Sequence, residues 1–327
     1  MKPLAAILGT GHYVPSRVMT NADLEKIVET SDEWIRSRTG IRERRIAAAD
    51  EHVSDMATYA GKAALESAGI QASELDLIIL ATLTPDYTWP AAACLVQRKL
   101  GAFRASAFDI SAACSGFVYG ISLAQAMVAA GTAKNILVIG AEKLSAVVDW
   151  KDRNTCVLFG DGAGAVVVGP NQGRGAILST HLGTDGTAVE LLYQPGGGTV
   201  CPVSPESLAE RKHFLHMNGK EVYKFAVKVM GEAAELAMAK AGLKSEDISL
   251  FIPHQANIRI IEAAAKRLEL PMEKVFINLD KYGNTSAASV GIALDEAQAA
   301  GRLKRGDKTV LVAFGAGLTW ASAVIEW

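Results

Sequence analysis

An internal repeat is the feature that most constrains the fold of this 327-residue chain. Three pairs of segments match in the same order along the chain. They begin at Ala68 (AGIQASELDLII) and Ala241 (AGLKSEDISLFI), at Lys134 (KNILVIG) and Lys308 (KTVLVAF), and at Ser111 (SAACSGF) and Ser286 (SAASVGI). Because the offsets of 173, 174 and 175 residues are nearly equal, we expect two similar halves, 1–172 and 173–327.

Strands and helices are expected to alternate within each half. Continuous Val, Ile and Leu runs, typical of strands covered on both faces, occur at 4–9, 75–82, 105–111, 134–141, 163–169, 248–254, 274–279 and 308–315. Apolar spacing predicts helices between them at 54–68, 115–130, 219–242, 256–269 and 287–300. This alternation indicates an α/β fold.

Composition excludes several classes of function. A formal net charge of −2 and a pI near 6.3 argue against nucleic acid and anionic membranes as partners. The sequence has no long apolar run of the kind that spans a bilayer, so we expect a cytoplasmic protein. Its four cysteines lack C-x-x-C spacing, and His213 and His216 have no third ligand nearby in the sequence. We therefore expect neither a disulfide framework nor a metal site.

Cys114 is the first candidate for chemistry. The stretch DISAACSGFVYG places it after a predicted strand and before a predicted helix, with Ser289 as its expected counterpart in the second half. A helix N-terminus favours an anion and lowers a thiol pKa, which predicts a nucleophilic thiolate. The other interpretation is a small, buried, inert side chain, which is common for a free cysteine.

His254 and Asn284 are the next candidates. His254 ends a predicted strand, and ligands of open α/β sheets bind at the carboxyl ends of strands. Asn284 lies in YGNTSAAS, at the turn before a predicted helix, where the alternative role is an ordinary helix cap. A papain-like hydrolase also combines Cys, His and Asn, but it is not built of duplicated α/β halves. We favour a cysteine that accepts an acyl group, with two donors that stabilise an enolate at a second thioester.

Two segments depart from the repeat. Residues 195–219 have no counterpart in the first half and are expected to form a loop over the site. Residues 20–46 are expected to form a capped helical excursion, with Thr30 and Glu33 as a capping-box pair. The arginines of this excursion and Trp34 make it a candidate surface for a phosphorylated ligand.

Taken together, the motifs resemble those of the β-ketoacyl-acyl-carrier-protein synthase III family, within the thiolase superfamily, over essentially the whole chain. The matching stretches are TSDEWIRSRTGIRERR (30–45), DISAACSGF (109–117), FGDGAGA (159–165), PHQANIRI (253–260), YGNTSAAS (282–289) and AFGAGLTW (313–320). The resemblance implies a layered αβαβα fold and a decarboxylative Claisen condensation of an acyl-CoA primer with malonyl-acyl-carrier protein, without a cofactor. It also implies a homodimer.

The resemblance also implies roles for individual residues. Cys114 carries the acyl group, and His254 and Asn284 stabilise the enolate of the malonyl thioester. The backbone N–H groups of Cys114 and Ala316 form the oxyanion hole; relatives often have glycine at the latter place.

Binding roles follow from the same resemblance. Trp34 and Arg153 flank the adenine of CoA, while Arg38 and Asn257 contact its pantetheine and phosphate portion. The expected patch for the acidic carrier protein consists of Lys224, Arg259, Lys266 and Arg267. Surface packing and a solvated charged face are the alternative interpretations of these residues.

Trp89 stands where relatives commonly have phenylalanine or a smaller residue that reaches into the acyl pocket across the dimer. Its bulk predicts a short primer, acetyl or propionyl. Within the same fold, an enzyme that makes a ketone, a quinolone or a polyketide starter is the alternative. A cysteine thioesterase and a non-catalytic scaffold with an inert Cys114 are the alternatives of other classes.

Overall fold

The computed structural model describes residues 4–173 and 175–327. The strands of its main sheet are β1 (Ala5–Tyr13), β4 (Leu77–Ala81), β5 (Ser106–Ile110), β6 (Ile136–Lys143), β7 (Asp161–Pro170), β8 (Ala176–Thr184), β11 (Leu250–Pro253), β12 (Lys308–Gly315) and β13 (Thr319–Glu326). Two small sheets pair β2 (Val18–Thr20) with β3 (Glu43–Arg45), and β9 (Leu192–Tyr193) with β10 (His216–Met217). The helices are α1 (Asn21–Leu24), α2 (Asp32–Thr39), α3 (Val53–Ala68), α4 (Ala92–Leu100), α5 (Gly116–Ala129), α6 (Pro205–Ala209), α7 (Gly219–Ala241), α8 (Ile258–Arg267), α9 (Leu279–Tyr282) and α10 (Ala288–Ala299).

The main sheet repeats one pattern of pairing on both sides of its centre. Its order is β11-β12-β13-β8-β1-β7-β6-β4-β5, and β8 meets β1 through the single pair Ala6 and Ala176. Outward from this junction, both sides show two antiparallel pairings followed by a parallel one. The internal repeat is therefore a repeat of topology.

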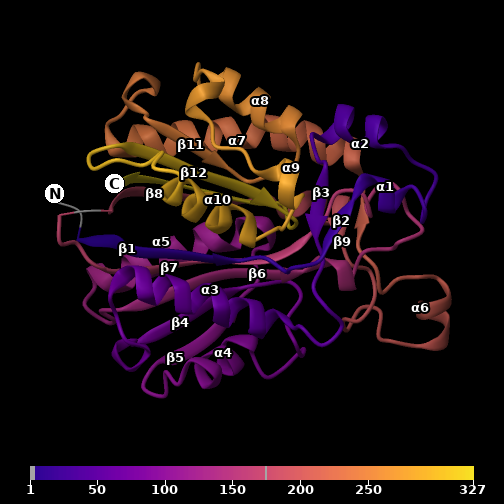
Figure 1. Ribbon diagram of the computed structural model, residues 1–327, viewed down its shortest axis with the longest axis horizontal. Helices are drawn as coiled ribbons and strands as arrows, with labels where there is room; N and C mark the ends of the chain where they lie inside the picture. The colour runs from indigo at the N-terminus through magenta and orange to yellow at the C-terminus, as the bar shows by residue number, and fades with distance from the viewer. Residues whose placement is uncertain (1–3, 174) are drawn as a thin grey trace.

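Side-chain alternation sorts the sheet and its helices into five layers. Ile78 and Leu80 of β4 pack in the core with α3 and α4, whereas Leu77 and Ile79 face α5. On the other side of the sheet, Phe251 of β11 belongs to the core with α7 and α8. Helices α5 and α10 thus lie between two half-sheets, with α3 and α4 outside one and α7 and α8 outside the other (Figure 1). This confirms the layered αβαβα fold.

The prediction of a strand at 274–279 was wrong. The segment begins with a 3₁₀ turn, Met272–Lys274, and pairs with β11 only through an isolated bridge between Phe251 and Val275. The side chain of Gln255 satisfies its backbone instead: Oε1 accepts from the N–H groups of Asn278 and Leu279, and Nε2 donates to Phe276. The amide of Gln255 thus makes the hydrogen bonds to this backbone that a neighbouring strand would otherwise make.

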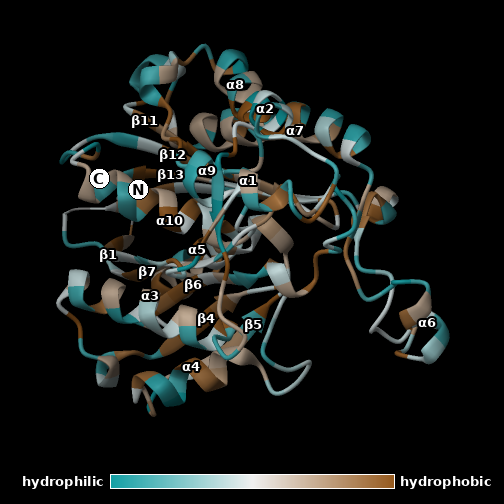
Figure 2. Cartoon of the chain, turned by 45° about the vertical axis from the view of Figure 1, so that its right-hand side comes forward, coloured by the Kyte–Doolittle hydropathy of each residue, from teal (hydrophilic) through white to brown (hydrophobic). Residues whose placement is uncertain are grey.

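The sequence patterns also missed some elements, namely β8, β13, α4 and several short ones. The insertion at 195–219 contains α6 and β10, and the part around α6 projects from the body of the molecule (Figure 2). Its C-terminal end does lie over the site, since Leu215 and Met217 line the cavities described below.

Candidate active site

One cavity of about 640 Å³ brings together six of the predicted site residues. Cys114, His254 and Asn284 line its inner part from both halves of the chain. The same cavity is lined by Trp34, Arg38 and Asn257. The predicted convergence of the three candidate catalytic side chains is therefore present.

A second cavity, of about 390 Å³, also reaches Cys114. Its lining is mostly apolar and includes Leu83, Leu144, Val147, Val189 and Leu215. Because the two cavities share the cysteine, a ligand in the larger one can deliver an apolar group to the smaller one past the sulfur.

Cys114 lies in a 3₁₀ turn, Ala113–Ser115, that continues directly into α5. Gly315 at the end of β12 packs against it: a Cβ on that glycine would lie 2.6 Å from the Cys114 backbone nitrogen. Ala316, the next residue, lines the smaller cavity and is not among the described residues with positive φ, so its Cβ causes no backbone strain.

The expectation of a thiolate in the unliganded protein was wrong. Cys114 is 7% exposed, and burial raises the pKa of its thiol to about 12. A hydrogen bond with the Ser286 side chain lowers the pKa and the charge of Glu142 raises it, but both effects are smaller than the desolvation. The favourable field of one helix end does not offset the loss of water around a charged sulfur.

His254 follows β11 and is held on its Nδ1 side. Its Nδ1 lies 2.6 Å from the Ser289 hydroxyl, and its backbone N–H donates to Val312 at 2.7 Å. Burial lowers the pKa of the imidazole to about 3, so the ring is neutral at physiological pH. With Nδ1 accepting from Ser289, Nε2 carries the proton and is a donor.

Asn284 is fixed by its own backbone and by a turn. Its N–H donates to Leu158 at 2.8 Å, and its carbonyl accepts from Gly160 at 3.0 Å. The side-chain Oδ1 accepts from the Ser286 N–H at 2.8 Å. Because the oxygen is occupied in this way, the NH₂ group is the part of the amide left for a ligand.

The two halves share a strained backbone position beside the site. Ala113 and Ser286 both have φ near +49°, in a region that side chains with a Cβ rarely adopt. These two residues are 173 positions apart. The same offset makes Ala287 the counterpart of Cys114 in the second half. The predicted counterpart, Ser289, is instead the partner of His254.

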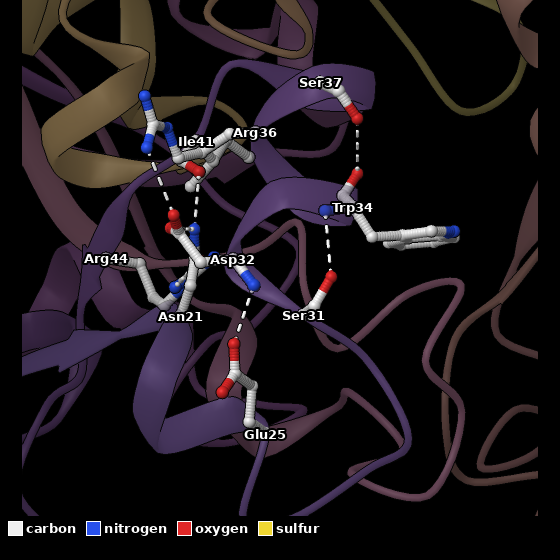
Figure 3. Close-up of polar contacts among 9 residues, drawn as sticks. All are labelled: Asn21, Glu25, Ser31, Asp32, Trp34, Arg36, Ser37, Ile41 and Arg44. Carbon is white, nitrogen blue, oxygen red and sulfur yellow. Dashed lines mark hydrogen bonds and ion pairs between the residues drawn. The ribbon is translucent and has the colours of Figure 1, made fainter.

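Trp34 is oriented by the first turn of α2. The N-cap of this helix is Ser31, whose hydroxyl accepts from the Trp34 N–H, so the predicted capping pair of Thr30 and Glu33 was wrong. Figure 3 shows the indole directed away from the polar network that anchors α2, in which Asp32 accepts from Asn21 and Arg36. The network fixes the helix while the ring faces the cavity.

Two guanidinium groups lie near the Trp34 ring. The Arg38 group is 4.4 Å from the ring centroid and the Arg153 group 5.3 Å, within cation–π range. Arg153 also donates to the carbonyl of Glu29 at 3.0 Å. Asn257 caps α8 through its Oδ1 and donates to the Arg38 carbonyl at 3.0 Å, which ties α8 to α2.

The four basic residues of the predicted carrier-protein patch are exposed, but their charges differ in availability. Arg267 is paired with Glu232 and Glu235 of α7, and Lys224 with Glu221. The other two are Arg259, which donates to the Ser37 carbonyl at 2.8 Å, and Lys266. Within the described residues Lys266 forms no ion pair.

Trp89 lies away from both cavities of its own subunit. Its side chain is 83% exposed, on the loop before α4. Within one chain, Trp89 therefore lines neither cavity.

The motifs missed three polar neighbours of the site: Ser286, Ser289 and Glu142. Both serines stand in the SAAS segment used for the repeat, whereas Glu142 belongs to no motif whose residue spacing would have predicted its position. Across residues 4–173 and 175–327, no group of three or more His, Cys, Asp or Glu is placed to hold a metal ion. Over the same ranges, no helix has the length and apolar character that crossing a membrane requires.

Comparison with known proteins agrees with this geometry. Two family models match, 3-oxoacyl-(acyl-carrier-protein) synthase III over 108–186 and its C-terminal region over 238–327. The β-ketoacyl-(acyl-carrier-protein) synthase III of Caldanaerobacter subterraneus subsp. tengcongensis is 59% identical over 326 residues, which cover 100% of this chain and 98% of the relative.

Other relatives lead to the same family. The enzyme of that name from Roseiflexus castenholzii is 56% identical over 327 residues, with 100% and 99% of the two chains covered. The crystal structure of 3-oxoacyl-(acyl-carrier-protein) synthase III from Aquifex aeolicus VF5 matches with a TM-score of 0.92 and 52% identity, over 99% of this chain and 100% of that one. The chain therefore belongs to the β-ketoacyl-(acyl-carrier-protein) synthase III family.

Proposed function

We propose that this acyltransferase condenses a short acyl-CoA with malonyl-acyl-carrier protein through an acyl group held on Cys114. The overall reaction gives 3-ketoacyl-acyl-carrier protein, CoA and CO₂, and it initiates fatty-acid synthesis. The observation that carries the proposal is the shared cavity of Cys114, His254 and Asn284, in a chain of this family.

In the first half-reaction the Cys114 sulfur attacks the thioester carbonyl of acyl-CoA, the bond to CoA breaks, and CoA leaves. We assign the oxyanion to the backbone N–H groups of Cys114 and Ala316. The close approach of Gly315 to the Cys114 backbone supports this assignment, because it brings the end of β12 next to the turn that carries the cysteine. The acyl chain then extends into the smaller, mostly apolar cavity.

In the second half-reaction malonyl-acyl-carrier protein enters the larger cavity. Neutral His254 donates through Nε2, and Asn284 donates through its NH₂ group, to the thioester oxygen. The two donors stabilise the enolate formed as CO₂ departs. The enolate carbon attacks the acyl carbonyl, the bond to sulfur breaks, and the thiol is regenerated after protonation.

Substrate binding extends outward from this centre. We assign the adenine of CoA to the space between Trp34 and Arg153, with Arg38 and Asn257 along the pantetheine and phosphate portion. For the acidic carrier protein we assign Arg259, Lys266, Lys224 and Arg267, with the smallest contribution from Arg267 because it is already paired.

A homodimer completes the proposal. Strand β5 is an edge strand of the main sheet, and its Phe108 is 37% exposed. Phe103 and Trp89 are also exposed nearby in the chain, and such surface favours burial by a second copy. Trp89 would then limit the acyl cavity of the partner to short primers.

We also propose that the protein acts in the cytoplasm. We divide the chain into two units, residues 1–172 and residues 173–327.

Intact-mass spectrometry tests the proposal. Incubation with acetyl-CoA should add one acetyl group, on Cys114, and later addition of malonyl-acyl-carrier protein should remove it with formation of a carbon–carbon bond. Cys114→Ala should remain unmodified and lose condensation by about 10³-fold or more. Release of free acid without a condensed product would instead indicate a thioesterase, and transfer of the acyl group to CoA-derived or free acceptors would indicate a ketone, quinolone or polyketide starter enzyme.

A further inference from the structure

A buried carboxyl group lies one hydroxyl away from the Cys114 thiol. Glu142, near the end of β6, is fully buried. Its Oε1 accepts from the Ser286 hydroxyl at 3.1 Å, and Ser286 lines the smaller cavity together with Cys114. The Ser286 hydroxyl also lowers the pKa of the Cys114 thiol, so this serine stands between the sulfur and the carboxyl group.

Neutral donors hold Glu142 in place on its other side. Thr84 donates to Oε2 at 2.6 Å, Thr82 donates to Oε2 at 3.4 Å, and the Leu83 N–H lies 3.1 Å from Oε2 and 3.2 Å from Oε1. Among the described residues it has no cationic partner. A carboxylate buried without a cation is costly, and hydrogen bonds from neutral donors or protonation of the group reduce this cost.

The other charged groups near this end of β6 are engaged elsewhere. Lys143 donates to the carbonyls of Ala48 and Glu51, and Asp161 on β7 accepts from Ala47 and Ser145. The titratable group that couples to Glu142 is thus the Cys114 thiol itself.

We propose that Glu142, acting through the Ser286 hydroxyl, takes up the proton of the Cys114 thiol as acyl transfer begins. The sulfur lone pair forms the bond to the acyl carbon while its proton passes to Ser286 Oγ and the Ser286 proton passes to Glu142. When the bond to CoA breaks, Glu142 returns its proton to the Ser286 oxygen and the Ser286 hydroxyl gives a proton to the departing CoA sulfur, so that acyl-CoA and thiol give thioester and CoA without a net proton. This inference rests on the proposed role of Cys114.

The protonation properties of the neighbours support this assignment. Burial raises the pKa of Glu142 to about 7, so the carboxyl changes charge near physiological pH. His254 has a pKa lowered to about 3 by burial, and it is therefore a weak base. Of the two groups, the carboxyl is the better proton acceptor for a thiol whose pKa burial has raised.

The test follows Cys114 alkylation by iodoacetamide and acetylation by acetyl-CoA, both measured on the peptide that contains Cys114 because other thiols are free, from pH 5.5 to 9. The wild-type rates should fall below an inflection near pH 7. Glu142→Gln and Ser286→Ala should lose that inflection and react about 10²-fold more slowly at pH 8. Thr84→Val, which removes a hydrogen bond to the carboxylate, should move the inflection to higher pH.

Ser322→Ala is the matched control, since Ser322 is a buried hydroxyl that donates to Ala233 and lines neither cavity. It should keep the wild-type profile. An inflection that persists in both Glu142→Gln and Ser286→Ala overturns the inference. If thermal unfolding shows that Glu142→Gln does not fold, Ser286→Ala decides, because Ala113 shows that this fold accepts alanine at a φ near +49°. Acetylation of a residue other than Cys114 would overturn the proposed function instead. The pH dependence of Cys114 alkylation would still test proton transfer through Ser286 to Glu142.

Discussion

The Nδ1 atom of His254 lies 2.6 Å from the hydroxyl of Ser289 on α10. The first turn of α10 therefore orients the imidazole ring that follows β11. Both residues are buried, at 1% and 2% exposure. In the tautomer whose Nδ1 accepts from this hydroxyl, Nε2 carries the proton and can donate to the proposed enolate.

Ser289→Ala should therefore slow condensation more than acylation. Without the hydroxyl, the imidazole loses the partner that selects its tautomer, and we expect kcat for condensation to fall by about ten-fold or more. The rate of Cys114 acetylation should stay near that of the wild type. Ser179→Ala, which removes a comparable buried hydroxyl bonded to Ala237, is the control. Equal losses in both half-reactions would contradict this role for Ser289.

The neutral state of His254 predicts a pH-dependent contribution to stability. The pKa of the folded-state imidazole is about 3, whereas an unfolded histidine titrates near 6.5, so unfolding takes up a proton between these values. The stabilising contribution is complete above about pH 6.5 and is lost as the pH falls toward 3. The free energy of unfolding of the wild type minus that of His254→Asn, from urea titrations, should rise by about 1 kcal/mol per pH unit between pH 4.5 and 6. It should be flat above pH 7; a constant difference would mean that the imidazole is not buried as a neutral ring.

Trp34→Ala and Arg153→Ala should weaken the binding of acyl-CoA without changing the chemistry. Loss of one stacking surface is expected to raise KM for acetyl-CoA by about ten-fold, with kcat nearly constant. A truncated acetyl thioester without the nucleotide provides the control, because its KM should not respond to either substitution. A change in KM for the truncated substrate would mean that these residues do not act through the nucleotide portion of CoA.

Lys266 and Arg267 should differ in their effect on the carrier protein. Lys266→Glu should raise KM for malonyl-acyl-carrier protein several-fold and weaken its dependence on salt, because it reverses an unpaired exposed charge. Arg267→Gln should have a smaller effect, since Glu232 and Glu235 already neutralise this guanidinium. Acetylation of Cys114 by acetyl-CoA should be unchanged in both variants. Equal effects on KM would show that the ion pairs with α7 open when the carrier protein binds.

Trp89 should limit the length of the primer. We expect faster turnover with acetyl-CoA than with decanoyl-CoA, and a smaller ratio of the two in Trp89→Ala because the indole is removed. Light scattering on both proteins should report the same dimer. Faster decanoyl turnover in the wild type would refute the steric argument.

Local patterns in the sequence predicted the α/β alternation, the repeat and the main candidate residues. The repeat and the apolar runs depend on local periodicity, which dictates strand, helix and buried face before any long-range contact is known. Cys114, His254 and Asn284 were recognisable because each stands beside a predicted element end, where backbone geometry positions a side chain.

The protonation states and the supporting contacts depend on long-range packing instead. A local argument gave Cys114 a lowered pKa, but burial by segments far away in the sequence raises it. In the same way, Gln255 replaces a strand at 274–279, and Glu142 meets Ser286 across 144 positions. Desolvation and hydrogen bonding depend on which atoms surround a group in space, and that information arises only when the two halves pack together.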